Sequence, residues 1–198
     1  EIPTDQRLID QLEAEYGPGL FDDLLAHAPE HSIELELVIL HRYLAKERPF
    51  RVVPLLVGSF WKSIDSHTPP REIPEIKRMM QALKTVTTKT TEPICFIISG
   101  DLAHIGPKFG SESPLTDTEL EHSRHQDRAL LRSLTKCDTD GYFSILLKEQ
   151  DERNICGYPP TLLTLDALGL EQGELLHYQQ YVAPDRTESV SFASMSFV

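Results

Sequence analysis

Four side chains that can bind a metal or move a proton stand close to turns of this chain: Asp101, His104, Cys156 and His31. Asp101 and His104 directly follow the apolar run 94–98, which reads as a buried strand. In α/β sheets the ligand crevice lies outside the carboxyl ends of strands. A carboxylate and an imidazole three residues apart at such an end suit proton transfer or metal-linked chemistry. The alternative is that Asp101 caps a turn and His104 is an ordinary histidine.

Cys156 is the cysteine with the best argument for being a ligand or a reactive thiol. It precedes a predicted helix over 161–168, and a helix N-terminus can stabilise a thiolate. The alternative is a small buried residue in a turn. Cys95 lies inside the apolar run, where it reads as packing, and Cys137 follows a helix. Three cysteines at irregular spacing form no disulfide framework, and they favour a reducing cytoplasm as the location.

Two further patterns look like metal sites but have simpler explanations. His122 and His125 can share one face of a predicted helix, yet charged residues surround them, which favours a solvated face. Asp138 begins a stretch with the spacing of a calcium-binding loop, but Phe143 stands where such a loop requires glycine. We therefore expect no calcium site there.

Helices and strands must position these residues. Apolar spacing and capping residues predict helices over 5–16, 20–26, 32–44, 75–88, 116–135, 141–150 and 161–168. The unbroken apolar runs 50–60 and 94–98 predict strands that are buried on both faces, as in parallel sheets. Alternating polar and apolar residues predict two more strands over 173–181 and 189–198. This order predicts one α/β domain over residues 1–198, with a mixed, largely parallel sheet flanked by helices.

Composition and charge exclude several classes of partner. The chain has 198 residues and a formal net charge of −12, which argues against a nucleic-acid-binding surface. No apolar stretch reaches the roughly 18 residues that a membrane-spanning helix needs. The first residue is Glu1 rather than methionine, so we expect that a segment precedes it in the native protein.

Short motifs in four places together resemble the Memo family, whose bacterial members belong to the AmmeMemoRadiSam group. They read Glu-His-Ser-Ile-Glu at 30–34, Val-Pro-Leu-Leu-Val-Gly at 53–58, Ser-Gly-Asp-Leu-Ala-His-Ile-Gly at 99–106 and Asn-Ile-Cys-Gly at 154–157. The tail Ser-Val-Ser-Phe-Ala-Ser at 189–194 is similar to the closing strand of that family. The resemblance implies a fold related to the class III extradiol dioxygenases, which are non-haem iron enzymes.

The resemblance also implies roles for individual residues. Cys156 matches the cysteine at the family's metal site, and His104 matches the pocket histidine that acts as acid and base in the dioxygenases. Asp101 matches the neighbouring carboxylate, and His31 matches a histidine lining the same pocket. Two more metal-binding histidines of the family lie in an N-terminal segment with a His-Ala-Gly motif. This chain carries no such segment, so we expect it to be the C-terminal two-thirds of the family's length.

Three functions are compatible with these residues. The first is a metal-dependent redox enzyme similar to a dioxygenase, with His104 as general base and Asp101 orienting it. The second is a binding module that holds a metal ion, such as iron, copper or zinc, or a peptide or small ligand, without turnover. The third is a non-functional remnant. The cysteine in place of a carboxylate and the missing histidines favour binding over catalysis.

Overall fold

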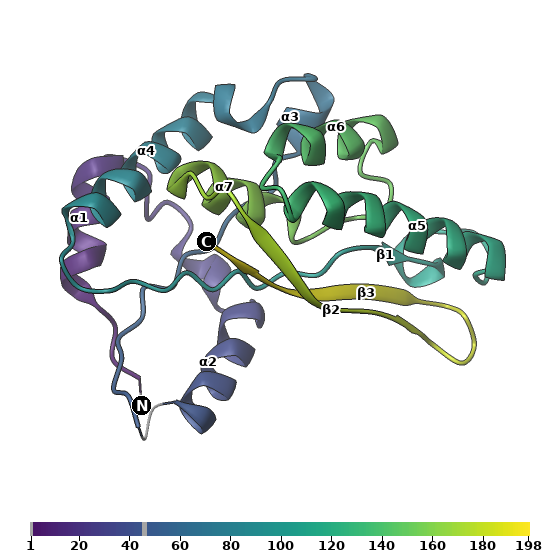
Figure 1. Ribbon diagram of the computed structural model, residues 1–198, viewed down its shortest axis with the longest axis horizontal. Helices are drawn as coiled ribbons and strands as arrows, with labels where there is room; N and C mark the ends of the chain where they lie inside the picture. Colours follow the sequence, from purple (N-terminus) through teal and green to yellow (C-terminus); the bar gives the residue numbers. More distant parts are fainter. Residues whose placement is uncertain (1, 45–46) are drawn as a thin grey trace.

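The computed structural model, which describes residues 2–44 and 47–198, places helices over one face of a long β-hairpin (Figure 1). Four helices form the centre of the packing: α4 (Pro74–Lys89), α5 (Asp117–Leu134), α6 (Thr139–Glu149) and α7 (Tyr158–Leu168). The hairpin consists of β2 (Gly173–Val182) and β3 (Ser189–Phe197), and α5 packs on both of its strands. The buried side chains form one hydrophobic cluster, which confirms a single α/β domain.

Side-chain caps begin three of the predicted helices, at Asp5, Thr116 and Asp138. The Asp5 carboxylate accepts the Leu8 N–H at the start of α1 (Gln6–Tyr16). Thr116 and Glu119 bond each other's backbone N–H groups at the start of α5, as a capping box does. These contacts satisfy N–H groups that the first helical turn leaves without partners. The observed helices confirm those predicted over 5–16, 75–88, 116–135, 141–150 and 161–168, with shifts of a few residues at their ends.

The predicted direction of the strands, in a mixed and largely parallel sheet, is wrong. The sheet has three antiparallel strands in the order β1-β3-β2, where β1 is the two-residue strand His104–Ile105. The strands predicted over 173–181 and 189–198 are confirmed as β2 and β3. Only six residues join them, which suffices for an antiparallel hairpin but is far shorter than a parallel crossover requires.

The two apolar runs are extended but do not form the predicted buried strands. Within the described residues, the run 50–60 makes a single isolated bridge, between Val52 and Thr4, and 94–98 belongs to no strand. Ile97 is 50% exposed, and Ile94 is exposed as well. A strand buried on both faces needs neighbouring strands and covering layers. An apolar run shows only that its residues avoid water, and it does not supply those neighbours.

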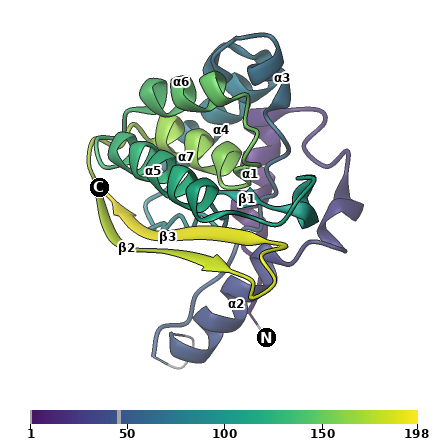
Figure 2. The ribbon, with the colours of Figure 1, turned by 90° about the vertical axis from the view of Figure 1, so that its right-hand side faces the viewer.

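Two further predictions concern the N-terminal third. The helix predicted over 32–44 is confirmed as α2 (Ser32–Tyr43), which projects away from the other helices and has no fully buried residue (Figure 2). The helix predicted over 20–26 is wrong: turns lead into the short 3-10 helix Leu24–His27. The segment between Gly19 and Pro29 is too short for a stable isolated α-helix.

Within residues 2–44 and 47–198, three more short helices are present: α3 (Trp61–Asp65) and the 3-10 helices Pro70–Glu72 and Pro107–Phe109. Among the residues that the structure describes, no helix is both long and apolar enough to cross a lipid bilayer.

We expect the core around α5 to dominate stability. Leu130 is fully buried, so Leu130→Ala should lower the free energy of unfolding by about 2–5 kcal/mol through lost burial and a residual cavity. Val38 on α2 is 61% exposed, so Val38→Ala should change it by less than about 0.5 kcal/mol. Denaturant unfolding of both variants measures the difference, and equal effects would contradict this core assignment.

Candidate metal centre

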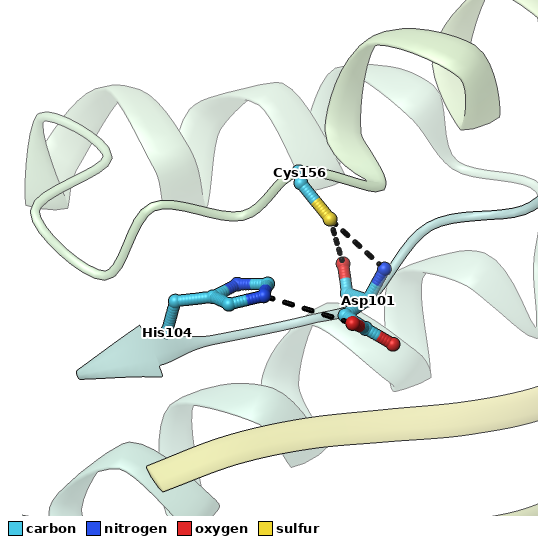
Figure 3. Close-up of side chains that lie close together, drawn as sticks. All are labelled: Asp101, His104 and Cys156. Atoms are coloured by element: carbon cyan, nitrogen blue, oxygen red, sulfur yellow. Dashed lines mark hydrogen bonds and ion pairs between the residues drawn. The ribbon is translucent and has the colours of Figure 1, made fainter. Parts of the chain in front are cut away.

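Asp101, His104 and Cys156 meet where two loops cross (Figure 3). One ligand atom from each side chain lies within 4.8 Å of the other two. Asp101 lies in the segment that leads into β1, His104 is the first residue of β1, and Cys156 comes from the loop between α6 and α7. The structure thus brings together three of the four residues singled out in the sequence.

Backbone hydrogen bonds hold the two loops against each other. The Gly157 N–H donates to the Asp101 carbonyl at 2.9 Å, and the His104 N–H donates to the Arg153 carbonyl at 2.7 Å. The Asp101 N–H donates to Cys156 Sγ at 3.1 Å. The positions of the three candidate ligands are therefore coupled through main-chain atoms as well as through their side chains.

Glycine is required on both sides of this crossing. A Cβ on Gly100 would lie 2.6 Å from the Gly157 Cα, and a Cβ on Gly157 would lie 2.7 Å from the Asp101 carbonyl oxygen. Both distances are too short for any real side chain, so larger residues would push the loops apart. These glycines explain why the Ser-Gly-Asp and Asn-Ile-Cys-Gly motifs meet in space.

The hydrogen bonds of His104 fix which ring nitrogen faces the site. Nδ1 lies 3.0 Å from the Asn154 carbonyl oxygen and 3.2 Å from the Leu102 carbonyl oxygen. Carbonyls can only accept, so Nδ1 carries the proton. Nε2, which lies 3.6 Å from Asp101 Oδ2, then offers its lone pair to the site whenever the ring is neutral. A carbonyl that holds the second nitrogen in this way is typical of metal-binding histidines.

Asp101 and burial act in opposite directions on His104. The nearby Asp101 carboxylate raises the pKa of His104 above its usual value, although partial burial opposes this effect. The positive charge of the protonated ring is favoured because Nε2–H then faces a carboxylate. A metal cation at this position would replace that proton and keep the same charge complementarity.

The expected stabilisation of a Cys156 thiolate is not observed. Desolvation by surrounding atoms raises the pKa of the Cys156 thiol, and this outweighs the hydrogen bond from the Asp101 N–H, which lowers it. Asp101 and Glu30 add like-charge repulsion against a thiolate. The net effect of these contributions is a raised thiol pKa, which disfavours the thiolate. Without a cation, Cys156 is a protonated thiol.

His31 lies outside this three-residue cluster. Its side chain is 79% exposed, and its Nδ1 lies 3.6 Å from Glu30 Oε1. The same Glu30 oxygen accepts the N–H groups of His31 and Ser32 at the start of α2. The Ser99 hydroxyl donates to the Ser32 carbonyl at 3.2 Å, which connects this helix start to the segment before Asp101. The acid–base roles of His31, His104 and Asp101 stay predictions.

The donor set fits a transition-metal ion. Tetrahedral zinc with metal–oxygen and metal–nitrogen bonds of about 2.0 Å places those two donors roughly 3.3 Å apart. The observed separation between Asp101 Oδ2 and His104 Nε2 is 3.6 Å. All three donor atoms lie within 4.8 Å of one another, and binding one ion would draw them closer together. Three protein ligands also leave a coordination position open to water or a substrate.

Sequence reasoning gave no role to Asn154 or Arg153, whose carbonyls hold His104. Asn154 has a positive φ of 53°, a conformation in which asparagine is enriched, and it lies inside a recognised motif. That was a usable signal. Arg153 offered none, because an arginine after two acidic residues looks like an ordinary surface charge.

We expect NMR titration to show a His104 pKa above the usual value of a histidine and a lower pKa in Asp101→Asn, because the amide keeps the shape but loses the charge. Since the folded-state pKa is raised, the ion pair stabilises the protein below the unfolded pKa. That contribution disappears as pH rises through the folded pKa. The control is Glu174→Gln on β2, opposite Ser196 near the far end of the sheet. An unchanged His104 titration in Asp101→Asn would contradict this pairing.

Comparison with known proteins agrees with the motifs. A sequence profile described as Memo-like protein matches residues 1–196. A MEMO1 family protein of Aquifex aeolicus is 25% identical over 200 residues, covering 100% of this chain and 48% of its own length. One of Methanopyrus kandleri is 28% identical, covering 89% of this chain and 54% of its own. A third, of Thermus thermophilus, is 33% identical over 127 residues, covering 64% of this chain and 32% of its own length. This chain thus spans about half the length of such relatives or less. Because the profile covers nearly every residue, the chain belongs to the Memo family.

Proposed function

We propose that this protein binds a transition-metal ion through Asp101 Oδ2, His104 Nε2 and Cys156 Sγ. The observation that carries the proposal is the convergence of these three donors, from two loops, within 4.8 Å. The orientation of His104 supports it further, because two carbonyls hold Nδ1 and leave Nε2 for the ion.

The donor types select a class of metal. Thiolate and imidazole favour zinc, iron(II) or copper, whereas calcium and magnesium prefer oxygen donors. A single carboxylate and two softer donors are therefore poorly suited to the alkaline-earth ions. The bound ion would supply Lewis-acid chemistry at its open position. The residues around it would orient whatever binds there.

Catalysis of a dioxygenase type is the second candidate, and the open coordination position favours it. The geometry restricts the roles in such a reaction. His104 has one nitrogen committed to carbonyl oxygens and the other facing the cluster, so it cannot be a ligand and a free general base at once. A proton-transferring group would have to come from elsewhere, and exposed His31, at the start of α2, is a candidate. The fold relation to extradiol dioxygenases that the motifs imply is also part of this proposal.

Metal analysis tests the proposal directly. We expect the wild-type protein to bind about one equivalent of zinc or cobalt(II), with a sulfur-to-cobalt charge-transfer band. Cys156→Ala should lose the band and weaken binding by more than the roughly 10- to 100-fold that loss of a supporting group costs. Cys95→Ala is the matched control, because Cys95 is an exposed cysteine in the extended run 94–98. Equal binding by both variants, or none by the wild type, would refute the metal site and leave a module for peptides or other small ligands.

The pH dependence of binding provides an independent check. Raised pKa values keep His104 and Cys156 more protonated near neutral pH than they would otherwise be. Binding must displace these protons, so affinity should rise with pH and protons should be released on binding. Calorimetry in two buffers of different ionisation enthalpy measures the release. Binding without proton release would show that Cys156 does not coordinate as a thiolate.

A further inference from the structure

We infer that Arg153 is a positioning residue for this metal centre: its buried guanidinium fixes the loop whose carbonyls orient His104 and whose end carries Cys156. The inference rests on the proposed metal-binding function. The Arg153 side chain is hydrogen-bonded to residues of α5 and α6, and it acts on the site through the backbone of its own loop.

The Arg153 guanidinium lies among acidic and polar groups with almost no exposure to water. Its Nε and Nη2 donate to the two carboxylate oxygens of Glu149, at 2.7 and 3.0 Å. Its Nη1 donates to Asp127 and also approaches Ser123 on α5. The side chains of Arg153 and Asp127 are 7% and 0% exposed. Such a two-point contact in a dry environment fixes the orientation of the guanidinium plane.

A second layer of contacts holds the acidic partners. The Tyr178 hydroxyl on β2 donates to the other Asp127 oxygen at 2.8 Å. Glu149 is the last residue of α6, and Asp127 lies on the buried side of α5. The guanidinium therefore joins two helices and, through Asp127, one strand of the sheet. It anchors the loop to α5, α6 and β2.

The main chain of Arg153 then transmits this anchoring to the site. Its carbonyl accepts the His104 N–H at 2.7 Å, and the carbonyl of the next residue, Asn154, accepts the His104 Nδ1–H at 3.0 Å. Two residues further on, Cys156 presents its sulfur to the Asp101 N–H. The contacts between this loop and the candidate ligands thus come from residues within four positions of Arg153.

The loop needs such an anchor because its backbone is locally unfavourable. Gln150, Asp151 and Asn154 all have φ between 50° and 53°, a region that side-chain-bearing residues seldom adopt. Three such residues within five positions persist only when surrounding contacts determine them. Asp151 contributes one contact by accepting the Ile155 N–H at 2.9 Å. The Arg153 cluster supplies the connection to the helices.

Two variants separate positioning from folding. Arg153→Lys keeps a positive charge beside Asp127 and Glu149 but loses the two parallel N–H bonds. Glu149→Gln keeps the side-chain shape but turns one acceptor into a donor that opposes the guanidinium. Thr139→Val is the control, because it removes a partly buried hydrogen bond, from Thr139 to Asp166 at 2.6 Å, away from this loop.

The first readout requires no metal. Long-range proton–nitrogen NMR of the His104 ring, at a pH well above its pKa, should show the Nδ1–H tautomer in the wild type. Arg153→Lys and Glu149→Gln should both populate the Nε2–H tautomer, because the Asn154 carbonyl is no longer held in place. Thr139→Val should leave the tautomer unchanged.

The second readout is cobalt(II) affinity, which we expect to fall about 10- to 100-fold in Arg153→Lys and to stay within about twofold in Thr139→Val. Folded Arg153→Lys protein with the wild-type tautomer and affinity would overturn the inference. The inference is also overturned if the loss of cobalt(II) affinity in the three variants is proportional to their loss of folding stability. If Arg153→Lys does not fold, Glu149→Gln decides in the same way. If the wild type binds no cobalt, the proposed function fails, while the tautomer still tests the positioning.

Discussion

The close crossing of two backbones at Gly100 and Gly157 is the constraint on which the rest of the site depends. At this point the Gly157 N–H donates to the Asp101 carbonyl, and α7 begins immediately afterwards. Any Cβ here would enter the opposite backbone. The contact therefore sets the distance between the Asp101 segment and the Cys156 loop. Side chains on the two loops can share one ion only because their main chains touch.

Electrostatics at this crossing favours a cation. The protein carries a formal charge of −12, and the site itself holds a carboxylate, a thiol and an imidazole. Desolvation raises the pKa of the Cys156 thiol, and Asp101 raises the pKa of His104, so both groups hold their protons more strongly than usual. A metal ion bound here would displace the protons of His104 and Cys156 and supply the positive charge itself. In the buried cluster around Arg153, the permanently charged guanidinium lies between the carboxylates of Asp127 and Glu149 and offsets their negative charge.

The antiparallel hairpin stabilises the site from the other side. Ser191 on β3 accepts the Leu102 N–H through its carbonyl, and its own N–H donates to the Ala103 carbonyl. The segment between Asp101 and His104 is thus held by β3 on one edge and by the Cys156 loop on the other. Apart from the isolated bridge between Val52 and Thr4, the apolar runs 50–60 and 94–98 lack such neighbours in the described parts of the chain, and they form no ladder.

The sequence by itself determined most helices and both strands of the hairpin. It also singled out Asp101, His104 and Cys156 as candidate residues of a site. Caps such as Asp5 and Thr116, and regular apolar spacing, are local signals, and local signals are enough to begin and end these elements. Only the tertiary structure decided which way the sheet runs, because strand pairing depends on residues far apart in the chain. It also decided that Arg153 is buried with two acids, since charge type alone predicts a surface position. Likewise, the meeting of Cys156 with Asp101 required the contact between two glycines 57 residues apart in the chain.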